Sequence, residues 1–384
     1  MKLLTDDLIN QIFLSHFSRA ADFVVKAPGR VNLIGEHTDY NGGFVLPVAI
    51  NYYTYIAAAS SNDNRLRVIA EDFNQQQITI NLSEGFVKDQ NESWPNYVYG
   101  VVQQLQLAGY QLKGGDLLIC GNVPAGAGLS SSASLEMALI RALLQLSNDK
   151  IDPTEAALLG QAAENQFVGC NCGIMDQLIS AQGQVSSALL IDCESLSTRA
   201  ISIPENWKLL IVHSGVKRGL VDSEYNQRRR QCETAAAFFK QSSLRQVSLS
   251  QLLAAEHQLD NLSFRRAHHV ITENERTLLA ADALVKGDIE TLSRVMAESH
   301  QSMRNDFEIT TPAIDQLVDI IQRAGGNQVG VRMTGGGFGG CVVAIADNEL
   351  IPTLIDAVKA DYLQITGCVP TIILAKASAG AFSD

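Results

Sequence analysis

The chain has 384 residues, which is long for one hydrophobic core and favours two domains. Its formal net charge of −12 argues against nucleic acid or an anionic membrane as the main partner. Its seven cysteines lack disulfide or zinc spacing, and its start lacks a signal-peptide core or an apolar run of ~20 residues, so we expect a soluble cytoplasmic protein with reduced thiols.

The first half mixes strand-like and helical patterns. A well-marked helix start lies at Asp152, which can act as the N-cap before Pro153, while Glu155 occupies the capping-box position. The predicted strands are Phe44–Ile50, Tyr53–Ala58, Leu66–Ala70 and Gln77–Leu82, and the predicted helices are Asn96–Leu107, Leu135–Leu146 and Pro153–Val168.

The sequence changes character after the predicted strand Leu209–His213. From Asp222 to about Ala324 the pattern is predominantly helical. We place the domain boundary within Ser195–Trp207, which divides the chain into domains 1–200 and 201–384, and the irregular order of elements indicates α+β rather than a doubly wound sheet. Further strands are predicted at Leu189–Asp192, Thr198–Ile203, Leu209–His213, Gly330–Met333, Cys341–Ala346 and Thr371–Ala375, and a last helix at Ile351–Tyr362.

The segment GEHTDYNGG, residues 35–43, places Glu36, His37 and Asp39 between two apolar stretches. A metal site is one interpretation, but adjacent residues of an extended segment point to opposite sides, so Glu36 and His37 would have difficulty meeting one ion. Hydroxyl recognition fits better, because carboxylates accept from O–H groups and imidazole can donate or accept. A plain polar turn would explain the glycines but not the residues before them.

A phosphate-binding loop is the best interpretation of Asn122–Ser134. It follows the predicted strand Asp116–Cys120 and precedes an apolar helix, where free backbone N–H groups and the helix dipole favour an anion. It lacks the lysine of a Walker A loop, so a triphosphate would need Mg²⁺ and residues elsewhere in the chain. The loop contains Gly126, Gly128, Ser130, Ser131 and Ser132.

A second glycine cluster, residues 334–340, formally contains GxGxxG. The dinucleotide-binding pattern must open a helix, whereas this cluster runs into the strand-like segment Cys341–Ala346. We therefore interpret it as a loop between two strands whose backbone approaches another loop or a ligand closely.

Three of these segments together resemble the motifs of one enzyme family. Residues 29–40, GRVNLIGEHTDY, are similar to the galactokinase signature, and PAGAGLSSSAS at 124–134 resembles the ATP motif of the wider GHMP kinases. Thr334–Gly340 resembles their third motif, and Cys172–Gln177 and Ser223–Asn226 also agree with the family in order and spacing. The resemblance spans nearly the whole chain.

The resemblance implies a two-domain α+β GHMP kinase with an N-terminal ribosomal protein S5-like domain and a C-terminal ferredoxin-like α/β sandwich domain. It implies an ATP- and Mg²⁺-dependent sugar kinase that converts α-D-galactose to galactose 1-phosphate, the entry step of the Leloir pathway. The expected partners are galactose and ATP, with neither nucleic acid nor a membrane, and a monomer is the default.

The resemblance also implies a role for each matching residue. Asp176 would act as general base on the anomeric hydroxyl, with Arg30 as its neighbour. The substrate-binding set would be Glu36, His37, Thr38, Asp39, Gly173 and Tyr225; the ATP-binding set Gly126, Ala127, Gly128, Leu129, Ser130, Ser131 and Ser132; and the metal ligands Ser132 and Glu164.

Other readings remain open from the sequence. The chain could be an N-acetylgalactosamine kinase or a catalytically silent galactose- and ATP-binding regulator, and a metal-dependent hydrolase built on Glu36, His37 and Asp39 is the weakest alternative. Arg228–Arg230 is interpreted as a solvated helix face. His268, His269 and His300 are interpreted as plain helix residues, because they have no carboxylate partners at ligand spacing.

Overall fold

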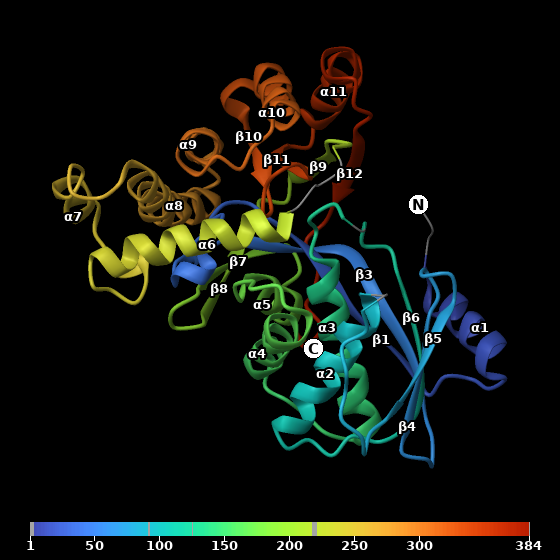
Figure 1. Cartoon of the computed structure of the whole chain (residues 1–384). Helices are drawn as coiled ribbons and strands as arrows, with labels where there is room; N and C mark the ends of the chain where they lie inside the picture. Colours follow the sequence, from blue (N-terminus) through green and yellow to red (C-terminus); the bar gives the residue numbers. More distant parts are fainter. Residues whose placement is uncertain (1–3, 91–92, 125, 217–220, 384) are drawn as a thin grey trace.

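The computed structural model describes residues 4–90, 93–124, 126–216 and 221–383, with backbone only at 221–223. It has two α+β halves that meet along a broad contact (Figure 1). The chain passes from the first half to the second between β8 (Ser197–Ser202) and β9 (Trp207–His213). The division at residue 200 stays a prediction. None of the helices within the described ranges combines the length and apolar character needed to cross a bilayer.

The N-terminal half is built on a five-stranded sheet of order β1-β3-β6-β4-β5. β4 and β6 pair in parallel, and the other neighbours are antiparallel. A smaller sheet of order β2-β7-β8 lies beside it. The strands are β1 (Phe23–Asn32), β2 (Phe44–Val45), β3 (Pro47–Ser60), β4 (Arg65–Ala70), β5 (Gln76–Asn81), β6 (Gly115–Gly121) and β7 (Ser187–Asp192).

Helices cover both faces of this sheet. The main core forms where inward-facing strand residues such as Ile56 and Leu117 pack against Val98, Met137 and Leu178 of the helices. On the other face α1 (Asp6–Phe17) packs through its own smaller cluster. The helices of the main core are α2 (Trp94–Leu107), α3 (Ser131–Ser147), α4 (Pro153–Ala162) with a π-helical continuation Ala163–Val168, and α5 (Met175–Gln182).

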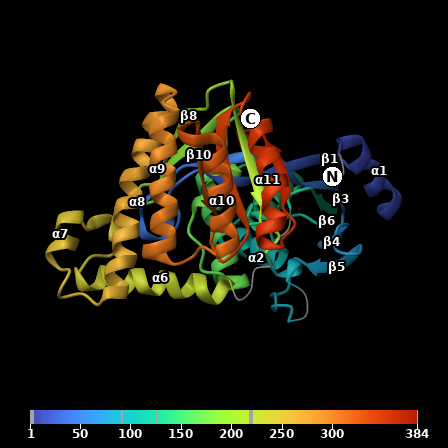
Figure 2. The ribbon, with the colours of Figure 1, turned by 90° about the horizontal axis from the view of Figure 1, so that it is seen from above.

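The C-terminal half is an antiparallel sheet of order β10-β11-β9-β12 with helices beside it. Figure 2 shows α8 to α11 side by side in this half, with α6 crossing beneath them. The remaining elements are α6 (Val221–Phe238), α7 (Leu249–Ala254), α8 (Asn261–Lys286), α9 (Ile289–Ser302), α10 (Pro312–Gly325), β10 (Val329–Thr334), β11 (Cys341–Asp347), α11 (Ile351–Thr366) and β12 (Thr371–Ala375).

The two halves share one hydrophobic core. Leu33 and Leu46 of the first half pack in the same cluster as Ile211 and Val343, which face them from the second sheet. The last residues return to the first half, where the Ser378 amide donates to the Ala49 carbonyl at 2.9 Å. This continuous packing fixes the position of the first half relative to the second.

Most predicted elements are found with small shifts of their ends. Asp152 does cap its helix, accepting from the amides of Thr154 and Glu155. The two predicted strands Phe44–Ile50 and Tyr53–Ala58 are wrong as separate units, because Pro47–Ser60 is one long strand. Three elements were not predicted: α1, most of β1, and α5.

Candidate active site

A cavity of about 240 Å³ lies where the two halves meet. Its walls bring together segments far apart in the sequence, from the strand that carries Arg30 to the glycine loop at Gly336. The predicted residues among its lining are Arg30, Glu36, His37, Asp39, Gly126, Gly128, Ser130, Ser131, Ser132, Glu164, Gly173, Asp176 and Tyr225. Residues that the family resemblance assigns to one site therefore do line one cavity, while the role of each residue stays a prediction.

Arg30 and Asp176 form a two-point ion pair at one side of the cavity. Arg30 Nε donates to Asp176 Oδ1 at 2.7 Å and Nη2 donates to Oδ2 at 2.8 Å. Burial alone would lower the pKa of Arg30, but the neighbouring carboxylates of Asp176 and Glu36 raise it, so the guanidinium stays charged. Asp176 lies in the first turn of α5, where the helix dipole favours a carboxylate.

The predicted phosphate loop, residues 122–134, is tied to this pair. Arg30 Nη1 donates to the Gly128 carbonyl at 2.7 Å, and the Ser130 hydroxyl donates to Asp176 Oδ2 at 2.5 Å. Gly128 has φ of 77°, and Ser130, the N-cap of α3, has φ of 57°, so the loop turns sharply before the helix begins. Two predicted ATP-binding residues, Ala127 and Leu129, are buried in the core between the halves and hold the loop in place.

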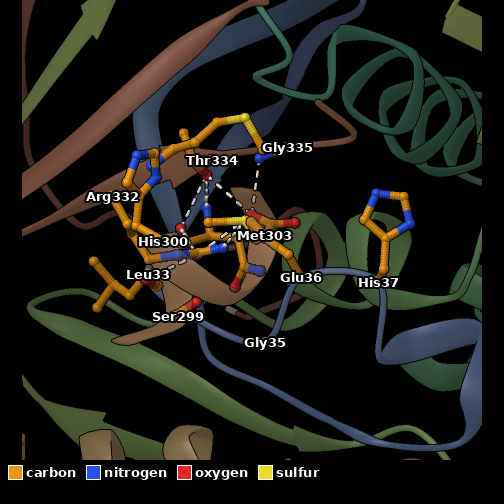
Figure 3. A network of polar contacts seen from close by, with 12 residues as sticks. Leu33, Gly35, Glu36, His37, Ser299, His300, Met303, Arg332, Thr334 and Gly335 are labelled. Atoms are coloured by element: carbon orange, nitrogen blue, oxygen red, sulfur yellow. Dashed lines mark hydrogen bonds and ion pairs between the residues drawn. The ribbon is translucent and has the colours of Figure 1, made fainter. Parts of the chain in front are cut away.

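Glu36 is held by the second glycine cluster. Its Oε1 accepts from the Gly335 amide at 2.8 Å, and the fully buried guanidinium of Arg332 lies 3.5 Å from the same oxygen (Figure 3). Burial raises the pKa of Glu36, and the nearby arginines oppose that rise. The cluster is thus a loop between β10 and β11, as predicted. Its backbone closely approaches residues 35–44, which we call the signature turn.

His37 points away from the Glu36 network (Figure 3). Its Nδ1 lies 2.7 Å from the Tyr40 hydroxyl and its Nε2 lies 3.3 Å from the Gly336 carbonyl. Burial lowers its pKa to about 3, so the ring is neutral and must donate from Nε2 to the carbonyl. With both ring nitrogens engaged and Glu36 turned elsewhere, this turn does not present a metal site.

Asp39 and Gly173 are neighbours in the cavity wall. A Cβ added at Gly173 would lie 1.9 Å from Asp39 Oδ2, so any larger residue there would have to displace that carboxylate. Burial and the charge of Asp176 raise the pKa of Asp39 to about 6. Keeping this carboxylate charged in the ligand-free protein therefore costs stability.

Asp39→Asn is expected to stabilise the ligand-free protein at pH 8. The folded-state pKa of about 6 lies above the ordinary aspartate pKa of 3.8, so stability falls as pH rises between these values. Removing the charge should raise the free energy of unfolding by about 1–2 kcal/mol at pH 8 and by much less near pH 4.5. Urea unfolding across that range measures the difference.

Asp361→Asn on the exposed face of α11 is the control for removing a surface charge. The Asp39 interpretation is wrong if Asp39→Asn is less stable than the parent at pH 8, or if its advantage does not shrink toward pH 4.5.

Thr38 is the predicted substrate-binding residue that the cavity does not reach. Its side chain is fully buried, and its hydroxyl lies 2.9 Å from the Gly35 carbonyl and 2.7 Å from the Phe44 carbonyl. These contacts close the turn on itself. Thr38 therefore shapes the turn and does not line the cavity.

Ser132 and Glu164 meet at the start of α3. The Ser132 side chain hydrogen-bonds the Glu164 carboxylate, whose pKa is raised by burial. Gln177 Nε2 donates to Glu164 Oε2 at 2.8 Å and to Glu136 Oε2 at 2.9 Å. Glu136, fully buried on α3, was not anticipated, because an isolated glutamate in an apolar helix gives no pattern that marks it.

Several residues without a predicted function make tertiary contacts in the structure. Arg228 is not solvated: it is buried, and its Nε donates to the Phe307 carbonyl at 2.8 Å. Two of the histidines pair with carboxylates from distant parts of the chain, since His268 lies 3.0 Å from Asp306 and His300 lies 3.3 Å from Asp315. All these partners lie at least fifteen positions away or on other elements, so no local spacing could reveal them.

Three segments of the chain match known protein families. Residues 11–60 match the galactokinase galactose-binding signature. Residues 96–184 match the GHMP kinases N terminal domain, and residues 280–364 match the GHMP kinases C terminal.

Solved structures agree with these matches. A structure of Lactococcus lactis galactokinase complexed with galactose is 34% identical, with a TM-score of 0.92 over 97% of this chain and 98% of that one. Methanococcus jannaschii mevalonate kinase is 21% identical, with a TM-score of 0.64 over 94% and 99%. Streptococcus pneumoniae phosphomevalonate kinase in complex with phosphomevalonate and AMPPNP is 17% identical, with a TM-score of 0.65 over 91% and 100%. The last two share the fold.

Proposed function

The chain belongs to the galactokinase family of the GHMP kinases, and from this premise we propose that it transfers the γ-phosphoryl group of ATP to the anomeric 1-hydroxyl of α-D-galactose. The products are ADP and galactose 1-phosphate. The main support from the site is that the Arg30–Asp176 pair and the phosphate loop line the same cavity as Glu36 and Asp39. The two substrates would meet there.

Asp176 and Arg30 are the proposed catalytic pair. Both Asp176 oxygens already accept from Arg30, but a carboxylate has about four acceptor positions, so it can also accept from the sugar 1-hydroxyl. As general base it would take the proton of that hydroxyl while the oxygen attacks the γ-phosphorus. The guanidinium of Arg30 would stabilise the charge on the transferring phosphoryl group.

The proposed sugar-binding wall consists of Glu36, His37 and Asp39 with Tyr225 and Gly173. The two carboxylates offer acceptor oxygens to a ring of hydroxyls, while the neutral His37 ring, already bonded through both nitrogens, would supply contact surface. A sugar whose 4-hydroxyl points the other way would leave one of these buried groups unpaired. Rejection of the wrong epimer should therefore exceed what shape alone provides.

We also propose that Mg²⁺ binds beside the ATP phosphates through Ser132 and Glu164. The donor set fits a hard cation, since Mg²⁺ prefers oxygen and is usually held by one or two protein groups together with phosphates and water. Within the described ranges no cluster of three or more His, Cys, Asp and Glu suits a metal. When bound, Mg²⁺ would neutralise charge on the phosphates. The glycine- and serine-rich loop has no lysine that could do so.

Substrate specificity is the direct test of the proposed function. With Mg²⁺ and ATP, we expect ADP release with galactose, and a kcat/KM for glucose lower by at least about 10²-fold. Excess EDTA should abolish turnover, and added Mg²⁺ should restore it. A coupled assay of ADP release measures all of these.

N-acetylgalactosamine is the informative control sugar. A higher kcat/KM with it than with galactose would make the protein an N-acetylgalactosamine kinase. Calorimetric binding of galactose and ATP without turnover would make it a silent regulator. The monomeric state and the cytoplasmic location stay predictions.

A further inference from the structure

One helix of the C-terminal half carries a polar stripe that faces the signature turn. His269, Glu273 and Thr277 lie four residues apart on α8, so they share one side of the helix, and all three are fully buried. The sequence alone does not mark this stripe as functional. In the structure it lies against residues 35–44, more than 220 positions earlier in the chain.

Glu273 is the centre of this contact. Its Oε1 accepts from the backbone amides of Gly35 at 3.0 Å and Glu36 at 3.3 Å, and also from the Ser299 hydroxyl at 2.7 Å. Two consecutive amides on one carboxylate oxygen fix the path of the chain at the point where the Glu36 side chain departs. These are charge-assisted bonds, which are stronger than bonds between neutral groups.

Two more residues of α8 hold the rest of the turn. His269 Nε2 lies 3.1 Å from the Glu36 carbonyl, and Asn274 Oδ1 accepts from the Phe44 amide at 2.9 Å. A Cβ on Gly43 would come within 2.3 Å of Asn274 Oδ1, so the turn and the helix touch directly there. The helix therefore holds both ends of the segment that contains Glu36, His37 and Asp39.

The buried charges around the turn are balanced. Arg276 Nε donates to Glu273 Oε2 at 2.8 Å, while Arg332 lies beside Glu36. Burial alone would raise the pKa of Glu273, but Arg276, His269 and Arg332 lower it to about 2. Glu273 is therefore charged in the folded protein, and it does not line the cavity.

We propose that Glu273 is a positioning residue for sugar recognition, acting through the backbone of Gly35 and Glu36 to place the Glu36 carboxylate in the cavity. This inference rests on the proposed galactokinase function. It assigns part of the sugar affinity to a residue of the C-terminal half that does not touch the sugar. ATP binding should be largely independent of it, because the phosphate loop is held by other contacts.

Glu273→Gln is the test, because the amide keeps the shape and one acceptor oxygen but loses the charge. We expect the KM for galactose to rise about tenfold, with the KM for ATP unchanged within about twofold and kcat reduced less than the galactose KM rises. Asn274→Ala, which frees the other end of the turn, should shift the same parameter in the same direction by a smaller factor. Steady-state kinetics with each substrate varied in turn measures the split.

Tyr362→Phe is the matched control for general destabilisation. It removes a buried hydrogen bond in the same half, from the Tyr362 hydroxyl to the Ser214 carbonyl at 2.9 Å, away from the turn. It should lower the melting temperature without raising the galactose KM.

If the parent enzyme phosphorylates galactose but neither Glu273→Gln nor Asn274→Ala changes its galactose KM by more than about twofold, the positioning role is wrong. An equal rise in the ATP KM would also overturn it. Absence of galactose turnover in the parent protein would instead refute the proposed function.

Discussion

Arg30→Ala is expected to lower kcat by about 10³–10⁵-fold, the range found for transition-state arginines in other phosphoryl transfers. The side chain touches both parts of the site, since it pairs with Asp176 through two nitrogens and donates to the Gly128 carbonyl of the phosphate loop. Because phosphoryl transfer is loose, charge stabilisation and positioning contribute more than covalent chemistry does. Single-turnover kinetics with saturating ATP and galactose measures the loss.

Arg30→Lys is the informative companion variant. It retains the positive charge but cannot reproduce the two-point pairing with Asp176, so its kcat should lie between those of Arg30→Ala and the parent. Circular dichroism and thermal unfolding show whether each variant is folded. A folded Arg30→Ala variant with near-normal kcat would remove Arg30 from the mechanism.

Asp176→Ala is expected to lower kcat by about 10²–10⁴-fold, the usual contribution of a general base. Its loss would also leave the Arg30 guanidinium and the Ser130 hydroxyl without the carboxylate that orients them. The effect on ATP affinity should be small, because the phosphate loop is also anchored by Arg30 at Gly128. The same single-turnover assay, with ATP binding measured separately, separates chemistry from binding.

Asp176→Asn distinguishes proton abstraction from positioning. The amide can still accept one hydrogen bond from Arg30 but cannot take a proton at neutral pH. If base catalysis dominates, Asp176→Asn should be as slow as Asp176→Ala, whereas a mainly orienting role would leave Asp176→Asn clearly faster. Turnover near the parent rate in both folded variants would contradict a catalytic role for Asp176.

Local patterns predicted many of the elements because their physical causes are local. The start of α4 follows from an N-cap at Asp152 and a proline that suits the first turn, and these features need no partner elsewhere in the chain. The strand-like run after the glycine cluster predicts a loop between strands, and β11 does begin at Cys341. The missed helix α5 lies in a short segment of eight residues, where periodicity carries little information.

The contacts that shape the site could not be derived in this way. Arg332 reaches Glu36 from 296 positions away, and Glu273 reaches Gly35 from 238 positions away. Arg228 and His300 have ordinary helical neighbours in sequence, and their partners Phe307 and Asp315 come close only after the helices pack. Resemblance to a family suggested the residues that line the cavity but not the ones that hold them.

The sequence by itself determined the α+β fold class, the glycine- and serine-rich turn into α3 and the polar groups of residues 36–39, because glycine spacing, capping residues and apolar periodicity act within a few turns of chain. Only the tertiary structure decided which of those groups face the cavity and which, like Thr38, turn inward. Burial and long-range pairing set the charge and orientation of Glu36, His37 and Asp39, and both depend on how the two halves pack together.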